Sequence, residues 1–281
     1  MKKLLIAGTV IALFLMGGSL VLSARRSDVP KAAAPPSGSL VALGDSVAAG
    51  VGLAPDSDSS ACARTDQSYP HLVAAKQNLN LHNLACTGAT LPAGIVGNQA
   101  VNQLAVAPQL DQLFALPMPT YITLTAGAND VDWTGFITKC YAGVCGTPAD
   151  TAAAAARLAA MSQNMQSLLK QIGEHYGDDS PPVLVTGYYQ VFPTTTAGCS
   201  DLSGIDAAEL AWGRQQQANL NDAIRTATSL FKFATFTPID FSGHELCSPD
   251  SWVQGLSDKQ PYHPTPAGQA AYATQIISAM K

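Results

Sequence analysis

A serine, a glycine, an asparagine and a histidine stand out in this sequence because together they could catalyse acyl transfer. Ser46 ends a Gly-Asp-Ser motif, Gly88 ends Ala-Cys-Thr-Gly, Asn129 lies in Gly-Ala-Asn-Asp, and His263 stands between a tyrosine and a proline. A serine hydroxyl becomes a nucleophile when a base removes its proton, and histidine is suited to that task near neutral pH. We therefore predict that Ser46 is the nucleophile and His263 the general base.

Acyl transfer also needs donors for the negative charge that develops on the carbonyl oxygen, an oxyanion hole. The candidates are the backbone N–H of Ser46, Gly88, and the side-chain NH₂ of Asn129. Each also has an ordinary structural explanation, because serine caps helices and glycine and asparagine form turns. The Gly-x-Ser-x-Gly elbow of α/β-hydrolases is absent around Ser46, so the sequence indicates either a different serine hydrolase architecture or no serine hydrolase at all.

Strand-like and helix-like stretches alternate along the sequence, which predicts an α/β fold with a parallel sheet and helices on both faces. Ligands bind such sheets outside the carboxyl ends of the strands. Ser46, Gly88 and Asn129 each follow a predicted strand, and His263 follows the last one after a long loop, so all four should meet at one edge. The predicted strands cover residues 40–43, 81–85, 120–126, 182–188 and 233–239, and the predicted helices cover 69–79, 151–176, 206–231 and a stretch from 265 onward.

Helical spacing predicts the buried face of two of these helices, and the last helix also has a recognisable N-terminus. Thr265 is the expected N-cap of the last helix, with Pro266 at the first helical position. By helical spacing, the buried residues should be Ala270, Ala273, Ile277 and Met280 in the last helix, and Leu158, Met161, Met165, Leu168, Leu169 and Ile172 in the 151–176 helix.

The four motifs resemble those of the SGNH (GDSL-type) hydrolase family, in the family order and across residues 39–281. The resemblance implies a flavodoxin-like three-layer α/β/α sandwich with a five-stranded parallel sheet. Family members are esterases, lipases, phospholipases, thioesterases and carbohydrate deacetylases. The cysteine pattern looks like that of the secreted bacterial lipase and phospholipase branch.

One position departs from the family pattern, which usually has Asp three residues before the histidine. Here that residue is Gln260. The third member of a triad orients the imidazole and stabilises its charged form. We expect a Ser46–His263 dyad whose imidazole is oriented by the backbone carbonyl of Gln260, with the Asp258 carboxylate as the rival.

The N-terminus predicts export. Two lysines precede an apolar run that ends at two arginines, so residues 1–26 indicate a signal peptide, or an uncleaved membrane anchor because the run is long enough to span a bilayer. Residues 27–38 are rich in Pro and Ala and indicate a linker. The hydrolase domain should occupy residues 39–281 and be secreted or held at the cell envelope, facing outward.

Six cysteines follow the export segment, and an even count in an exported protein predicts three disulfides. Fifteen pairings are possible. Proximity in sequence favours Cys62–Cys86, Cys140–Cys145 and Cys199–Cys247. A zinc site is disfavoured because no second Cys or His pair has the required spacing, and we expect neither a metal nor a cofactor.

We therefore predict an exported serine hydrolase that cleaves carboxylic acyl esters of small molecules or lipids through an acyl-enzyme on Ser46. The alternatives are a carbohydrate O-deacetylase of the envelope and a catalytically silent binding module. The net charge of −5 and the absence of a basic stripe argue against nucleic acid as a partner, and we expect a monomer. An acyl pocket or a sugar platform could draw on seven aromatic residues: Trp133, Phe136, Tyr141, Tyr188, Tyr189, Phe192 and Trp252.

Overall fold

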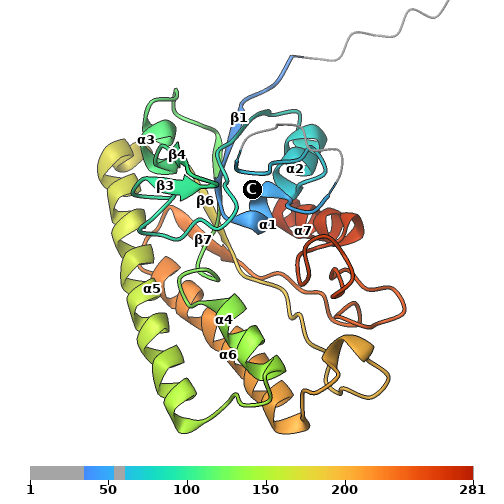
Figure 1. Cartoon of the computed structure of the whole chain (residues 1–281). Coiled ribbons are helices and arrows are strands. Elements are labelled where there is room, and N and C mark those ends of the chain that lie inside the picture. Colours follow the sequence, from blue (N-terminus) through green and yellow to red (C-terminus); the bar gives the residue numbers. More distant parts are fainter. Residues whose placement is uncertain (1–34, 54–60, 281) are drawn as a thin grey trace, which may run out of the picture. The chain divides into compact units, whose positions relative to one another are not determined.

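A five-stranded parallel sheet forms the centre of the molecule (Figure 1). The computed structural model describes residues 35–53 and 61–280. Along the sheet the strands lie in the order β2-β1-β5-β6-β7, and all four neighbouring pairs are parallel. The strands are β1 (Ser39–Gly44), β2 (Asn80–Asn83), β5 (Tyr121–Thr125), β6 (Val183–Thr186) and β7 (Ala234–Thr237). The five predicted strands are confirmed, with small differences at their ends.

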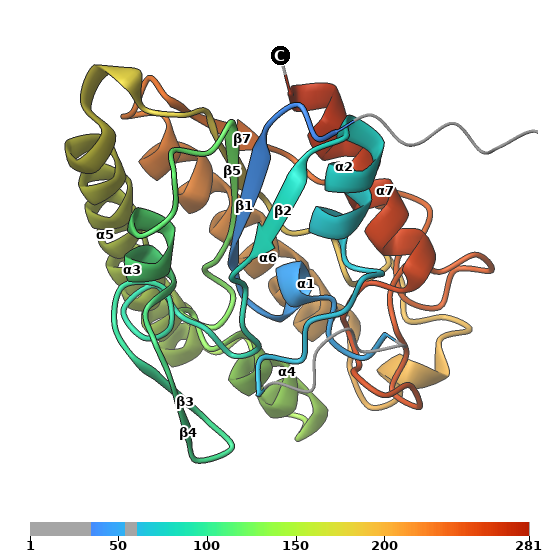
Figure 2. The ribbon, with the colours of Figure 1, turned by 90° about the horizontal axis from the view of Figure 1, so that it is seen from above.

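Helices cover both faces of this sheet, so the fold is the expected three-layer α/β/α sandwich (Figure 2). On one face lie α2 (Tyr69–Gln77) and α7 (Pro266–Ala279), and on the other lie α3 (Gln109–Phe114), α5 (Pro148–Tyr176) and α6 (Ala207–Thr228). The short helices α1 (Ser46–Ala49) and α4 (Trp133–Tyr141) follow the carboxyl ends of β1 and β5. The remaining elements are a hairpin of β3 (Gln99–Val101) and β4 (Leu104–Val106) and two 3₁₀ turns, Gly177–Asp179 and Ser200–Leu202.

The long helices begin at capping residues that the sequence supplies. In α5 the Thr147 side chain accepts from the Asp150 backbone and the Asp150 carboxylate accepts from the Thr147 backbone, which is a capping box. Asp206 and Glu209 form the same arrangement at α6. Thr265 caps α7 through a 3.2 Å bond from Gly268 N, as predicted.

The predicted buried face of α7 is confirmed at Ala273 and wrong at Ala270. Ala270 is exposed, and Ile277 and Met280 are only partly buried. The helix instead buries Gly268, Gln269, Tyr272, Ala273 and Ile276. The face is rotated because two polar side chains find partners inside: Gln269 binds two main-chain groups, and the Tyr272 hydroxyl donates to the Gly187 carbonyl at 2.7 Å. The predicted face of α5 is buried as expected, with Leu158 at its margin.

The three disulfides join Cys62 to Cys86, Cys140 to Cys145 and Cys199 to Cys247, the pairs that proximity in sequence favoured. The first links the segment after α1 to the loop that carries Gly88, and the second closes the end of α4. In the chain-entropy picture, the two longer loops would each stabilise the fold by about 3–4 kcal/mol.

The export segment expected over residues 1–26 lies outside the described residues, as does most of the linker expected over 27–38. Within residues 35–53 and 61–280, the helices are too short or too polar to cross a bilayer.

Gln269 should contribute strongly to stability, because its buried amide accepts from Tyr69 N at 2.7 Å and donates to Val47 O at 3.0 Å. We expect Gln269→Ala to lower the free energy of unfolding by about 2–4 kcal/mol, since both main-chain groups lose their partner away from water. Gln275 bonds Asp240 N and O in the same manner at a more exposed site. Gln275→Ala should cost less than half as much in denaturant unfolding, and equal losses would contradict this account.

Candidate active site

Ser46 is positioned by the tight junction between β1 and α1. Gly44 has φ +151°, and a Cβ there would lie 2.5 Å from the Thr125 carbonyl oxygen of β5, so only glycine fits. The Gln109 amide also holds this residue, accepting from Gly44 N at 2.8 Å and donating to Gly44 O at 2.9 Å. Ser46 then opens α1, where Gly50 ends the helix in a left-handed conformation.

Asp45 links this junction to the pocket wall. One carboxylate oxygen caps α1 by accepting from Val47 N at 2.9 Å, and the other accepts from the Tyr188 hydroxyl at 2.6 Å. The side chain is 1% exposed, and this burial raises the pKa of Asp45 to about 6 despite the hydrogen bond from Tyr188. The sequence motif pointed to Ser46 alone, whereas the structure shows that its neighbour holds the turn.

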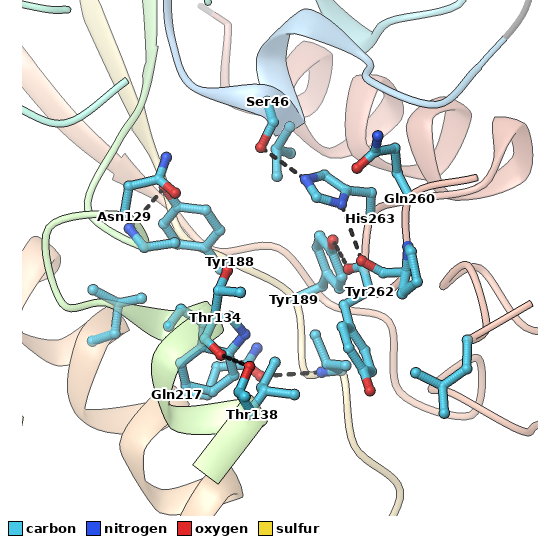
Figure 3. Close-up of a pocket in the computed structure, with 18 of the residues that line it drawn as sticks. Ser46, Asn129, Thr134, Thr138, Tyr188, Tyr189, Gln217, Gln260, Tyr262 and His263 are labelled. Atoms are coloured by element: carbon cyan, nitrogen blue, oxygen red, sulfur yellow. Dashed lines mark hydrogen bonds between the residues drawn. The ribbon is translucent and has the colours of Figure 1, made fainter. Parts of the chain in front are cut away.

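Ser46 and His263 lie in hydrogen-bonding contact although 217 positions separate them. The Ser46 Oγ is 2.8 Å from His263 Nε2 (Figure 3). Burial lowers the pKa of His263 below its usual range, so the imidazole is neutral at neutral pH. A neutral imidazole can take the serine proton, which is what activation of the hydroxyl requires.

The other imidazole nitrogen, Nδ1, lies 3.1 Å from the carbonyl oxygen of Pro261, and the predicted Gln260 carbonyl is a second, smaller influence on the ring. Because a carbonyl can only accept, Nδ1 carries the hydrogen and Nε2 is left bare toward Ser46. The Gln260 carbonyl also accepts from the backbone N–H of His263, at 3.3 Å. The Asp258 carboxylate, the rival orienter, accepts from the backbone N–H of Gly255 at 2.7 Å.

Tyr262 sets the backbone conformation directly before His263. Its φ of +70° lies in the left-handed region, which is uncommon for a bulky side chain, and it turns the backbone directly before His263. Three contacts hold it there: its N–H donates to Gln254 O at 2.8 Å, its carbonyl accepts from Tyr189 OH at 2.7 Å, and its hydroxyl donates to Tyr141 OH at 2.6 Å.

The predicted oxyanion donors come from two loops that are joined by hydrogen bonds. Asn129 Nδ2 donates to the carbonyl of Ala89 at 2.9 Å, and the neighbouring Asp130 carboxylate accepts from Leu91 N at 3.0 Å. Gly88 has φ +74°, which favours glycine. Within the described residues, the backbone N–H groups of Ser46 and Gly88 have no acceptor, so both are free to bind a ligand oxygen.

A pocket of about 430 Å³ opens beside the Ser46–His263 pair. Ser46, Asn129 and His263 line it, whereas Gly88 does not. Four of the seven aromatic candidates contribute to its wall, namely Trp133, Tyr141, Tyr188 and Tyr189. Most of the remaining wall is aliphatic, and none of the described residues that line it is Lys, Arg, Asp or Glu. A neutral, largely apolar pocket of this size suits a hydrocarbon tail.

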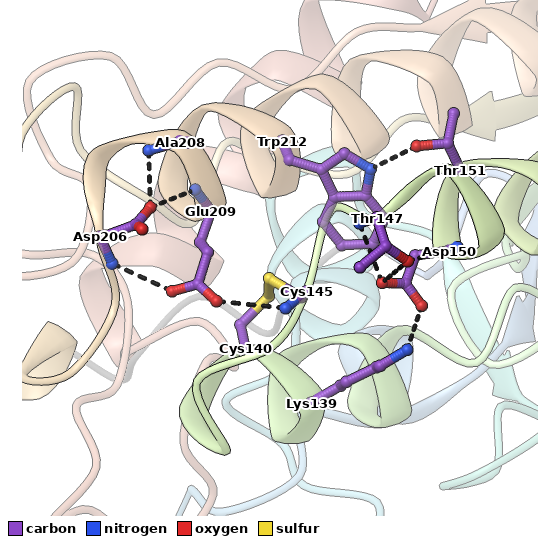
Figure 4. The surroundings of a disulfide bond; sticks show 10 residues. All are labelled: Lys139, Cys140, Cys145, Thr147, Asp150, Thr151, Asp206, Ala208, Glu209 and Trp212. Atoms are coloured by element: carbon purple, nitrogen blue, oxygen red, sulfur yellow. Dashed lines mark hydrogen bonds and ion pairs between the residues drawn. A yellow bond between two sulfur atoms is a disulfide. The ribbon is translucent and has the colours of Figure 1, made fainter.

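Helix α4 forms one wall of this pocket and is anchored at its carboxyl end (Figure 4). Beyond the Cys140–Cys145 disulfide, the Cys145 backbone N–H donates to the Glu209 carboxylate of α6 at 3.1 Å. Lys139 pairs with Asp150 at the start of α5. The wall is therefore held against two long helices. In the described part of the protein, no cluster of His, Cys, Asp or Glu is arranged to hold a metal ion.

Comparison with known proteins identifies the family. The model of the GDSL-like lipase/acylhydrolase family matches residues 42–271. The protein belongs to this family. It is a carboxylic ester hydrolase, as the sequence predicted, and not a silent binding module. A lipase of Streptomyces rimosus is 31% identical over 270 residues, which cover 92% of this protein and 90% of the relative.

Two solved structures also resemble this GDSL-like hydrolase. Phospholipase A1 from Streptomyces albidoflavus NA297 has a TM-score of 0.66 and 27% identity, covering 86% of this protein and 99% of its own length. The extracellular lipase of Streptomyces rimosus has a TM-score of 0.63 and 29% identity over the same shares of the two proteins. These relatives support the lipase and phospholipase branch that the cysteine pattern resembled.

Several pocket residues were not predicted, above all Gln217 in α6. The helix buries Leu210, Gly213, Leu220 and Ile224, and Gln217 continues that series at helical spacing. A glutamine in an otherwise apolar series was the available signal. It was missed because spacing alone does not show which helical face lines a cavity.

Burial of the Asp45 carboxylate should make stability depend on pH. The pKa is raised from 3.8 to about 6, so its contribution is fully present below pH 3.8 and lost as the pH rises through 6. Asp45→Asn keeps an oxygen for Val47 N–H but cannot ionise. Between about pH 4 and 7.5, we expect the wild type to lose up to about 3 kcal/mol of unfolding free energy relative to Asp45→Asn. Denaturant unfolding at both pH values measures this, and a pH-independent difference would contradict it.

Proposed function

We propose that this enzyme hydrolyses esters of long acyl groups, as found in lipids, through an acyl-enzyme on Ser46. The observation that carries the proposal is the 2.8 Å contact between Ser46 Oγ and His263 Nε2 beside a largely apolar pocket of about 430 Å³. An acetyl group would leave most of that space unused, so a carbohydrate O-deacetylase fits it less well. The similarity to lipases and a phospholipase A1 favours the same class.

In the proposed reaction, His263 Nε2 accepts the proton of Ser46 as Oγ attacks the ester carbonyl carbon. Negative charge then develops on the carbonyl oxygen, where the N–H groups of Ser46 and Gly88 and the second hydrogen of the Asn129 amide are the proposed donors. His263 next protonates the leaving alcohol. The same imidazole finally deprotonates water, which attacks the acyl-enzyme and releases the acid and free Ser46.

The imidazolium formed in these steps is stabilised by the Pro261 carbonyl at Nδ1, in place of a carboxylate. A carbonyl dipole fixes the ring and its tautomer but stabilises positive charge less than an anion would. We propose a dyad with a main-chain orienter.

We also propose that the enzyme acts outside the cytoplasm. The three disulfides support this because such bonds persist in oxidising compartments. The charged and apolar start of the sequence and the similarity to an extracellular lipase point the same way.

Replacing the nucleophile should abolish turnover. We expect Ser46→Ala to lower kcat on 4-nitrophenyl esters of both short and long acids by at least about 10³-fold. An organophosphonate should label the wild type at Ser46 and leave the variant unlabelled, as mass spectrometry would show.

Among the 4-nitrophenyl esters, the wild type should hydrolyse those of the longer acids with the higher kcat/KM. Equal turnover by both proteins would reject the nucleophile, and a preference for acetyl esters would reject the acyl class.

The pH profile should report on the imidazole. Because burial lowers the pKa of His263, the base form persists into mild acid, and kcat/KM should fall with a midpoint below about 6.5. Gln260→Ala and Asp258→Asn should leave that midpoint and most of kcat unchanged, since neither side chain bonds the ring. If Asp258→Asn instead lowers the midpoint and kcat together, the carboxylate orients the imidazole.

A further inference from the structure

Gln217 places a buried amide in the largely apolar wall of the pocket. The residue is 2% exposed, and its Oε1 accepts from the backbone N–H of Val191 at 3.1 Å. Figure 3 shows Gln217 across the pocket from Ser46. The amide therefore belongs to the part of the pocket that faces away from the reacting ester.

The orientation of this amide is fixed by its partner. Val191 N–H can only donate, so the oxygen of Gln217 must face it and the NH₂ group must face the other way. Among the described residues, Nε2 has no acceptor, and it is not sealed from solvent as the buried unpaired polar atoms of this protein are. Thr134 and Thr138 line the same pocket near Gln217 (Figure 3), but the Thr138 hydroxyl donates to the Thr134 carbonyl, and no hydrogen bond joins either residue to Nε2.

A donor in this position discriminates between ligands. An all-carbon tail that fills the pocket displaces water from Nε2 and leaves the donor unpaired, whereas a tail with an oxygen at that point restores the bond. The pocket holds no charged residue among those described, so an ionised acceptor would lose its hydration without a counter-charge. A neutral oxygen, as in a hydroxyl, ether, ketone or ester, meets both conditions.

We infer that the Gln217 amide forms a subsite for a neutral oxygen acceptor carried by the substrate at a distance from the scissile ester. This inference rests on the proposed function, because it specifies the substrate of the same pocket. The oxygen can belong to the acyl group or to the alcohol portion, for example as a second ester group. Gln217 is then a specificity residue and takes no part in bond cleavage.

The test compares esters that differ only in one oxygen. In the first series, 4-nitrophenyl esters of a fixed acyl length carry an ether oxygen at successive positions of the acyl group. In the second, mono- and diesters of one diol differ in a second ester group of the alcohol portion. Each enzyme is scored by its own ratio of kcat/KM for the oxygenated and the all-carbon substrate, so changes in overall activity cancel.

We expect a ratio of about tenfold at one oxygen position in the wild type, in whichever series matches the source of the acceptor. Gln217→Met and Gln217→Leu both remove the donor at similar size. Both should bring the ratio to about one. Gln216→Met is the matched control, since Gln216 is buried in α6 but does not line the pocket. It should keep the wild-type ratio.

Two results would overturn the subsite: a wild type that hydrolyses all-carbon esters with no preference in either series, or a preference that survives in the Gln217 variants. The proposed function would stand in both cases. Failure of the wild type to hydrolyse any of these esters would instead reject the proposed function itself.

Discussion

The site depends on how closely the end of β1 approaches the end of β5. Gly44 pairs with Thr125 across the two strands, and the next backbone N–H, that of Asp45, donates to the Thr125 carbonyl at 3.0 Å. No side chain fits between them, and the Gln109 amide bonds both main-chain groups of Gly44. Ser46 therefore leaves the sheet at a point set by main-chain contacts. A nucleophile held in this way needs no reorganisation before it reacts, which is the basis of electrostatic preorganisation.

The sequence could predict this edge because strand ends in a parallel sheet are determined by topology. Apolar runs separated by predicted helices indicate parallel strands. The carboxyl ends of parallel strands lie at the same edge of the sheet. Ser46, Asn129 and His263 could thus be placed in one region without coordinates. The family resemblance then assigned roles to residue types that each have common structural uses.

The hydrogen-bond partners inside the protein could not be predicted in the same way. The imidazole faces Pro261 because Tyr262 adopts a positive φ, and residue type does not favour that conformation. The face of α7 was misplaced because Gln269 is buried, whereas helical periodicity assigns glutamine to the surface. Gln109, Gln217 and Gln269 all bond main-chain groups through buried amides. Neutral amides avoid the desolvation penalty of buried charges, which suits a protein in which only 12% of residues are charged.

The docking of α7 on α2 has a consequence for how the enzyme fails under stress. The contacts between these helices include the stacked rings of Tyr69 and Tyr272 and the bond from Tyr69 N to Gln269, and His263 enters the site just before α7 begins. Proteins open locally at free energies below that of global unfolding. A partial opening that released α7 would separate the imidazole from the hydroxyl while the central strands stayed paired. Loss of turnover on warming would then precede the loss of secondary structure, making catalysis a sensitive reporter of this one helix.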